Sequence, residues 1–287
     1  MATHPLPLLM SAAALRERIG NPRLAVFDCR FSLKDTEAGR HAYAAGHLPG
    51  AIYAHLDERL SGPVRTGTGR HPLPEPALLA GWLGASGVGN DTDVVVYDDL
   101  GGAFAVRLWW LLRWLGHHRV AVLDGGIGAW QAGGGALTTM VPEPTPAILS
   151  AKPDDSLWIT TDALAAALPT GAVQVIDARA PERYRGEQEP IDPVGGHIPG
   201  AINLPFTENL GPDGRFLPAV VLRRRFDDAL GSIPPTRLAH SCGSGVNACH
   251  NLLAMELAGL AGSRLYAGSW SEWIRSPDRP ITRGARG

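Results

Sequence analysis

The 287-residue sequence contains only three cysteines, no long hydrophobic run and no excess of charge of either sign. Cys29, Cys242 and Cys249 are odd in number and lack the spacing of metal ligands, so the sequence predicts neither a disulfide framework nor a metal site. Because so few cysteines are characteristic of reducing compartments, we expect a cytoplasmic protein.

The missing features also exclude two kinds of partner. No stretch approaches the roughly 18 consecutive apolar residues of a membrane helix, and residues 1–10 lack the basic start and apolar core of a signal peptide. Lys and Arg number 26 against 28 Asp and Glu, a net charge of −2. This balance gives no electrostatic reason to expect nucleic acid. We therefore expect neither a membrane nor a nucleic-acid partner.

Apolar strands alternate with helical patterns along the chain. With 45% hydrophobic and 19% charged residues, the composition is typical of a globular protein with an ample core. Strands are predicted at 24–28, 94–98 and 120–123, and helices at 77–85 and 103–115. This alternation predicts an α/β fold in which a parallel sheet carries helices on both faces.

The first half of the sequence is repeated in the second half, at an offset of about 142 to 150 residues. The matching pairs are 24–28 with 173–177, 46–51 with 196–201, 94–97 with 238–241, and 123–126 with 265–268. A proline-rich stretch separates the halves and is typical of a stiff linker. We therefore predict a domain at 1–140, a linker at 141–155 and a second domain at 156–287.

Cys242 ends a short apolar run at 238–241, and a helical pattern follows it. At a strand-to-helix junction, free N–H groups and the helix dipole stabilise an anion. A thiol at such a place loses its proton more easily, and the thiolate is the nucleophilic form. A buried structural cysteine is the alternative. Gly243 and Gly245, on either side of Ser244, let the backbone curl around the sulfur and favour the nucleophile.

The segment Cys242–Val246 resembles the active-site loop of the rhodanese family, in the form of its 3-mercaptopyruvate sulfurtransferase branch. The Gly-His-Ile-Pro-Gly-Ala segment at 196–201 and the stretch 268–273 are also similar to that family. The resemblance implies two tandem rhodanese-like domains and an enzyme without metal or organic cofactor. Sulfane sulfur from a small-molecule donor would form a persulfide on Cys242 and pass to a thiol, a thioredoxin-like protein or cyanide.

Asp98 stands in the first half where the second half has Cys242. A carboxylate cannot accept a sulfur atom, so the first domain is expected to be catalytically silent. Since only one of the two domains carries a nucleophile, we expect the site where the domains meet.

The resemblance implies a proton relay in which His47 pairs with Ser244 and with an upstream aspartate, Asp35. Glu37 is a rival for that carboxylate. The alternative for His47 is a structural role in its His-x-Pro-Gly turn, which is what we expect of His197 in the second half.

Arg183 matches the family arginine that binds the anionic group of the donor, a task suited to a guanidinium fork. The alternative is a surface ion pair with Glu182 or Glu187. The remaining predicted substrate-binding residues are Gly243, Gly245 and Val246. The family's second arginine, just after a Glu-Pro pair, is replaced here by Ile191. His71, in a Gly-Arg-His-Pro stretch, receives no role from the sequence.

Two other functions compete with sulfur transfer. A cysteine phosphatase needs an arginine six residues after its cysteine, and Ala248 holds that position. A non-enzymatic persulfide carrier would keep Cys242 without turnover. Between donors, the neutral loop around Ser244 favours 3-mercaptopyruvate over thiosulfate, because a dianion gains most from cations beside the cysteine.

Overall fold

The structure is a computed structural model that describes residues 6–285, and it divides into two compact units. The first unit comprises the chain up to residue 62 together with 74–154 and 212–216. The second comprises 63–73, 155–211 and the chain from residue 217 onward. A short segment of each half of the sequence therefore belongs to the compact unit formed by the other half.

The first unit is built on a five-stranded parallel sheet in the order β1–β5–β4–β2–β3. Its strands are β1 (Leu9–Met10), β2 (Leu24–Asp28), β3 (Ala51–Tyr53), β4 (Asp93–Tyr97) and β5 (Val120–Leu123). Every residue of β4 is buried, as expected of a parallel strand covered on both faces.

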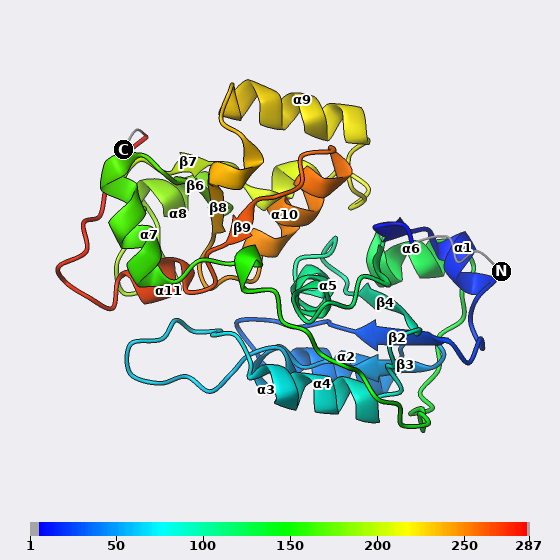
Figure 1. The fold of residues 1–287 in the computed structure, drawn as a ribbon. Helices are drawn as coiled ribbons and strands as arrows, with labels where there is room; N and C mark the ends of the chain where they lie inside the picture. The colour runs from blue at the N-terminus through cyan, green and yellow to red at the C-terminus, as the bar shows by residue number, and fades with distance from the viewer. Residues whose placement is uncertain (1–5, 286–287) are drawn as a thin grey trace. The chain divides into compact units, whose positions relative to one another are not determined.

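Helices cover both faces of this sheet. They are α1 (Ala12–Arg16), α2 (Ala38–Ala45), α3 (Leu56–Arg59), α4 (Pro76–Ala85), α5 (Ala105–Trp114) and α6 (Gly126–Ala132). Val26 belongs to a core cluster with Leu15 of α1 and Ile127 of α6. The next residue, Phe27, points to the other face and packs on Trp82 of α4, with ring centroids 5.5 Å apart. Helices α1 and α6 thus lie on one face and α4 on the other (Figure 1).

The second unit contains a four-stranded parallel sheet in the order β7–β6–β8–β9. Its strands are β6 (Gln174–Asp177), β7 (Ile202–Asn203), β8 (Leu238–Ser241) and β9 (Arg264–Leu265). Its α-helices are α7 (Thr161–Ala167), α8 (Pro181–Arg185), α9 (Ala219–Leu230), α10 (Ala248–Leu257) and α11 (Ser269–Trp273). Its 3-10 helices are η1 (Asp155–Leu157), η2 (Leu168–Thr170), η3 (Phe206–Asn209) and η4 (Pro235–Arg237).

This sheet, too, is covered on both faces. Ala239 of β8 lies in a core cluster with Leu164 of α7 and Trp270 of α11. The next residue, His240, points to the opposite face, and helix α10 lies against β8 (Figure 1). Within residues 6–285, no helix has both the length and the apolar character needed to cross a membrane.

The two sheets repeat one plan, which confirms the predicted α/β class. The order β5–β4–β2–β3 in the first unit corresponds to β9–β8–β6–β7 in the second. In the first unit, Arg30 donates to the carboxylate two residues before it and, at 2.7 Å, to the carbonyl oxygen of Gly46. In the second unit, Arg179 makes the same bonds, again at 2.7 Å to the carbonyl oxygen of Gly196. Arg179 therefore has a structural role within the second unit.

Candidate active site

Cys242 follows the last residue of β8, and α10 begins only at Ala248, so residues 242–247 form a loop, here called the cysteine loop. The side chain of Cys242 is buried, and its Sγ accepts the backbone N–H of Gly245 at 3.2 Å. Gly245 has φ +78°, and an added Cβ would lie 2.3 Å from the carbonyl oxygen of Ala267, so only glycine fits. The predicted strand–loop–helix around the thiol is confirmed, with Val246 buried inside the loop.

The start of α11 holds the cysteine loop in place. The N–H of Cys242 donates to Ser269 Oγ at 3.0 Å, and its carbonyl oxygen accepts the N–H of Trp270 at 3.0 Å. The N–H of Ser271 donates to the carbonyl oxygen of Gly243 at 2.9 Å. Ser269 is fully buried with φ +52°, a conformation rare outside glycine that concentrates at functional sites. The loop backbone is thus fixed independently of the thiol.

In the equivalent loop of the first unit, backbone N–H groups converge on the carboxylate of Asp98. Oδ1 of Asp98 accepts the N–H groups of Leu100 at 2.9 Å and Gly102 at 2.8 Å. Oδ2 accepts those of Phe104 at 2.8 Å and Ala105 at 2.9 Å. Four backbone donors therefore surround a buried carboxylate at the position that corresponds to Cys242. A loop of this kind at the end of a strand stabilises negative charge.

Ser244 is hydrogen-bonded to a histidine 173 positions away in the sequence. Nδ1 of His71 lies 2.7 Å from Ser244 Oγ, and each of the two residues is 5% exposed. His71 belongs to the segment 63–73, which is part of the second unit. A buried serine–histidine contact beside a cysteine can move a proton close to the sulfur.

Backbone hydrogen bonds to α11 position the segment 63–73. The N–H of Gly69 donates to Glu272 Oε2 at 3.1 Å, and the N–H of Arg70 donates to Ser271 Oγ at 3.1 Å. Glu272 Oε1 in turn accepts the hydroxyl of Thr161 at the start of α7. Helix α11 thus holds both the cysteine loop and the segment that carries Arg70 and His71, which gives the 268–273 stretch a structural purpose.

His47, the histidine expected to pair with Ser244, makes different contacts. Its Nδ1 lies 2.8 Å from the carbonyl oxygen of Tyr43 and its Nε2 lies 3.1 Å from that of Met140. Its ring stacks on Tyr43 with centroids 3.9 Å apart. Both nitrogens are thus engaged with backbone in the first unit, as in the structural alternative. The histidine that contacts Ser244 is His71.

Asp35 and Glu37, the candidate carboxylates for His47, lie at the start of α2 instead. Asp35 Oδ1 accepts the N–H of Glu37 at 3.1 Å, and Glu37 pairs with Arg40 at 3.0 Å. Glu37, His55 and Glu58 are close enough together to hold a metal ion. However, Arg40 also pairs with Glu58 at 2.6 Å, and His55 Nδ1 accepts the N–H of Glu58 at 3.4 Å. We therefore assign Glu37, His55 and Glu58 to ion pairing and helix capping rather than to metal binding.

Arg183 is directed at buried carboxylates. Its Nη2 donates to Glu189 at 2.7 Å and to Asp192 at 3.3 Å. The alternative partner Glu187 pairs with Arg185 instead, at 2.7 Å. Burial opposes the charge on Glu189, but its hydrogen bonds, first among them those from Arg183, lower its pKa below the usual value. Arg183 is therefore fixed as a cation at the edge of the cysteine loop.

A second arginine, Arg70, reaches the same loop. It forms an ion pair with Asp192, and its buried Nε has no hydrogen-bond partner among the described residues. A Cβ added to Gly243 would lie 2.8 Å from Arg70 Nη2. Burial is the main cause that raises the pKa of Asp192. Ile191, where an arginine was expected, is 41% exposed.

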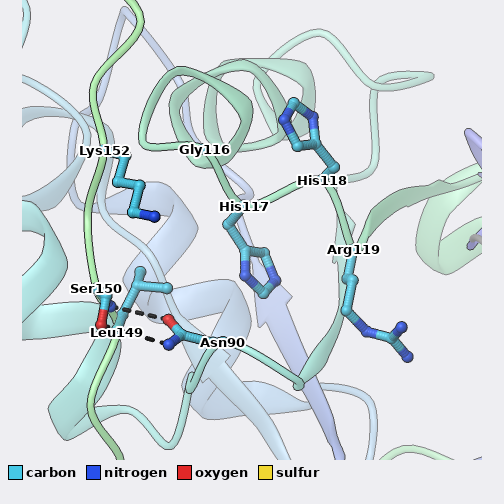
Figure 2. Close-up of a pocket in the computed structure, with 8 residues that line it drawn as sticks. All are labelled: Asn90, Gly116, His117, His118, Arg119, Leu149, Ser150 and Lys152. Atoms are coloured by element: carbon cyan, nitrogen blue, oxygen red, sulfur yellow. Dashed lines mark hydrogen bonds between the residues drawn. The ribbon is translucent and has the colours of Figure 1, made fainter.

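The first unit contains a separate cavity of about 560 Å³ (Figure 2). It is lined by Asn90, Gly116, His117, His118, Arg119, Leu149, Ser150 and Lys152. Asn90 is bonded to Ser150 through both its oxygen and its nitrogen, and Arg119 pairs with Asp93 at 2.5 Å. Burial lowers the pKa of His117, which favours its neutral form. No cysteine lines this cavity, and we assign it no part in chemistry.

Comparison with known proteins finds the same kind of domain in each half of the chain. The family model described as Rhodanese-like domain matches residues 11–133 and 160–276. A probable 3-mercaptopyruvate sulfurtransferase of Pseudomonas aeruginosa is 52% identical, over 96% of this chain and 98% of that protein. A thiosulfate sulfurtransferase of Rattus norvegicus is 36% identical, over 96% and 94%. The solved 3-mercaptopyruvate sulfurtransferase from Leishmania major superposes with a TM-score of 0.85 at 33% identity, covering 98% of this chain and 78% of that one.

Proposed function

Because the chain belongs to the rhodanese-like family and is a sulfurtransferase, we propose that Cys242 accepts sulfane sulfur from 3-mercaptopyruvate. The observation that carries this proposal is the buried Sγ of Cys242, which accepts the N–H of Gly245 at 3.2 Å in a loop fixed by α11. The first unit is catalytically silent, because Asp98 occupies the corresponding position. A thiol, a thioredoxin-like protein or cyanide removes the sulfur, in a reducing, cytoplasmic setting where Cys242 remains free.

The proposed reaction has two half-reactions. The Cys242 thiolate attacks the sulfur of the donor, so that an S–S bond forms and the donor's C–S bond breaks. The electron pair of that bond stays on the carbon as the enolate of pyruvate, which then takes a proton. The acceptor thiolate next attacks the outer sulfur of the persulfide and releases Cys242 as a thiolate. The enzyme thus alternates between free and persulfidated forms.

Ser244 and His71 are the groups that we propose to supply the proton. Their contact of 2.7 Å is buried and lies two residues along the loop from Cys242. A hydroxyl polarised by an imidazole can protonate the enolate while the imidazole restores the hydroxyl proton. Thiosulfate leaves sulfite, which needs no proton on carbon, so this pair favours 3-mercaptopyruvate as the donor.

The test combines intact-mass measurement with steady-state kinetics. Treatment with 3-mercaptopyruvate should add one sulfur atom to the wild type and none to Cys242→Ser. Cys249→Ser is the matched control, because Cys249 is an equally buried cysteine on α10. Sulfur transfer that survives Cys242→Ser would overturn the proposal. Loading of Cys242 without turnover would identify a persulfide carrier, and a higher kcat/KM for thiosulfate would overturn the choice of donor.

A further inference from the structure

We propose that the cavity of the first unit binds the phosphate group of a small molecule, either free phosphate or a phosphate ester. This site is separate from sulfur transfer and takes no part in its chemistry. Arg119 directly precedes β5 and Asn90 lies shortly before β4, so both stand at the amino ends of parallel strands. Asp98, whose loop corresponds to the cysteine loop, follows the carboxyl end of β4. The cavity and that loop therefore lie at opposite edges of one sheet.

Cationic side chains line the cavity, and no acidic residue of the described chain does. His117, His118, Arg119 and Lys152 are among the eight lining residues, and none of the eight is Asp or Glu. Lys152 is exposed, and no carboxylate among the described residues pairs with it. The positive charge of Lys152 is therefore available to an anion that enters the cavity.

Among residues 6–285, two buried nitrogens of the cavity have no hydrogen-bond partner. His117 is only 4% exposed, and its Nε2 is unpartnered. Nε of Arg119 is also buried without a partner, although its Nη2 pairs with Asp93 at 2.5 Å. Buried polar atoms almost always have partners, so these two nitrogens mark a position for the oxygen atoms of a ligand. A guanidinium donates to an oxyanion, and an imidazole nitrogen can hydrogen-bond to an oxyanion or to a hydroxyl.

The lining side chains converge on one space. Figure 2 shows the ring of His117 and the side chain of Lys152 directed toward the space beside Asn90, whereas His118 points away. Asn90 is held by Ser150, whose Oγ accepts its amide at 3.3 Å and whose N–H donates to its oxygen at 2.9 Å. The volume of about 560 Å³ is in the range of small-molecule pockets. It exceeds what a bare phosphate ion needs and thus favours an ester.

Part of the cavity belongs to the linker between the two repeats. Residues 149–152 lie outside the segments 11–133 and 160–276 that match the family model, so the site is a feature of this chain's linker rather than of the family's domain. The N–H of Lys152 donates to the carbonyl oxygen of Leu115 at 2.9 Å and ties the linker to the first unit. An anion bound to Lys152 would add a contact and slow the local opening of this stretch.

Calorimetry with inorganic phosphate, AMP and adenosine at constant ionic strength tests the proposal. Phosphate and AMP should bind, AMP more tightly, whereas adenosine, which lacks the phosphate group, should not. Lys152→Met should raise both dissociation constants about 10-fold or more, the effect of losing a charged hydrogen bond. Lys34→Met is the matched control, because Lys34 is an exposed lysine of the same unit that does not line the cavity. Equal affinities for phosphate and AMP would identify free phosphate as the ligand.

Hydrogen–deuterium exchange locates the bound anion. Saturating phosphate should slow the exchange of backbone N–H groups at 149–152 in the wild type and in Lys34→Met, but not in Lys152→Met. Failure of both phosphate and AMP to bind, or an unchanged affinity in Lys152→Met, would overturn the proposal. Protection confined to the cysteine loop would also overturn it, because the anion would then be bound at the active site.

Discussion

Nδ1 of His71 lies 2.7 Å from Oγ of Ser244, and the two residues are 173 positions apart in the chain. The contact exists because residues 63–73, which belong to the first half of the sequence, pack within the second unit. It places the imidazole of His71 beside the hydroxyl of Ser244, which lies two residues along the cysteine loop from the thiol of Cys242. The predictions below follow from this arrangement and from the loops around it.

The first prediction concerns His71 as the proton source. His71→Gln should lower kcat with 3-mercaptopyruvate by about 10²-fold, because general acid–base catalysis typically contributes that much. The second half-reaction, from the persulfide to cyanide, should change little, since it forms no enolate. Rapid-mixing measurement of persulfide formation and of its decay separates the two steps.

The comparison variant for this test is His47→Gln. Both nitrogens of His47 contact backbone carbonyl oxygens in the first unit. We therefore expect this variant to lower the free energy of unfolding while the rate of persulfide formation stays near that of the wild type. A His47→Gln protein that folds normally yet forms persulfide about 10²-fold more slowly would restore the assignment made from the sequence.

The second prediction concerns Asp98, whose carboxylate accepts four backbone N–H groups in a buried loop. Asp98→Ala should lower the free energy of unfolding by at least about 3 kcal/mol, because several buried donors lose their acceptor at once. Urea denaturation followed by circular dichroism measures the change. Asp99→Ala, an exposed neighbour, is the control and should cost far less. Equal costs for the two variants would show that the four hydrogen bonds contribute little.

Much of the fold was predictable because buried parallel strands are continuous apolar runs. The strands predicted at 24–28 and 238–241 have those same bounds in β2 and β8. The repeat in the sequence likewise predicted two sheets of one plan, because the same residues recur in the same order. Local pattern was sufficient wherever the structure depends on neighbours in sequence.

The hydrogen bond between Ser244 and His71 could not be predicted from local sequence pattern. His71 lies in a Gly- and Pro-rich stretch without periodicity, and nothing in the sequence indicates that residues 63–73 pack in the second unit. One signal against His47 was present: the same His-x-Pro-Gly turn recurs at His197 in the second half, which favours a structural role for the histidine in both places. The structure gives both the same role, with His197 Nδ1 2.8 Å from the carbonyl oxygen of Tyr184.

The third prediction is a pH dependence of stability caused by His240, next to last in β8. Burial lowers the pKa of His240 to about 3, and both its ring nitrogens lack partners among the described residues. In the unfolded chain the pKa is about 6.5. The stability that depends on neutral His240 is therefore present above about pH 6.5 and is lost as the pH falls toward 3, by about 2 kcal/mol at pH 5.

His240→Leu isolates this contribution, because all other titrating groups stay the same. Urea denaturation of wild type and variant at about pH 7.5 and about pH 5 gives the two pH-dependent losses. The wild type should lose about 2 kcal/mol more than the variant between these conditions. Equal losses would mean that His240 gains a proton, or a partner, in the folded protein.

The last prediction uses two glycines of the cysteine loop that matter for different reasons. In Gly243→Ala the new methyl group would meet Arg70 Nη2 at 2.8 Å, and a flexible side chain can move away. In Gly245→Ala it would meet the carbonyl oxygen of Ala267 at 2.3 Å at a residue with φ +78°, and neither backbone can move cheaply.

Gly243→Ala should therefore raise KM for 3-mercaptopyruvate about 10-fold, as loss of a charged hydrogen bond does, with kcat nearly unchanged. Gly245→Ala should lower kcat and the free energy of unfolding together. Kinetics and urea denaturation of both variants check this, and a fall in kcat without a rise in KM for Gly243→Ala would show that the space beside Arg70 is not where the donor binds.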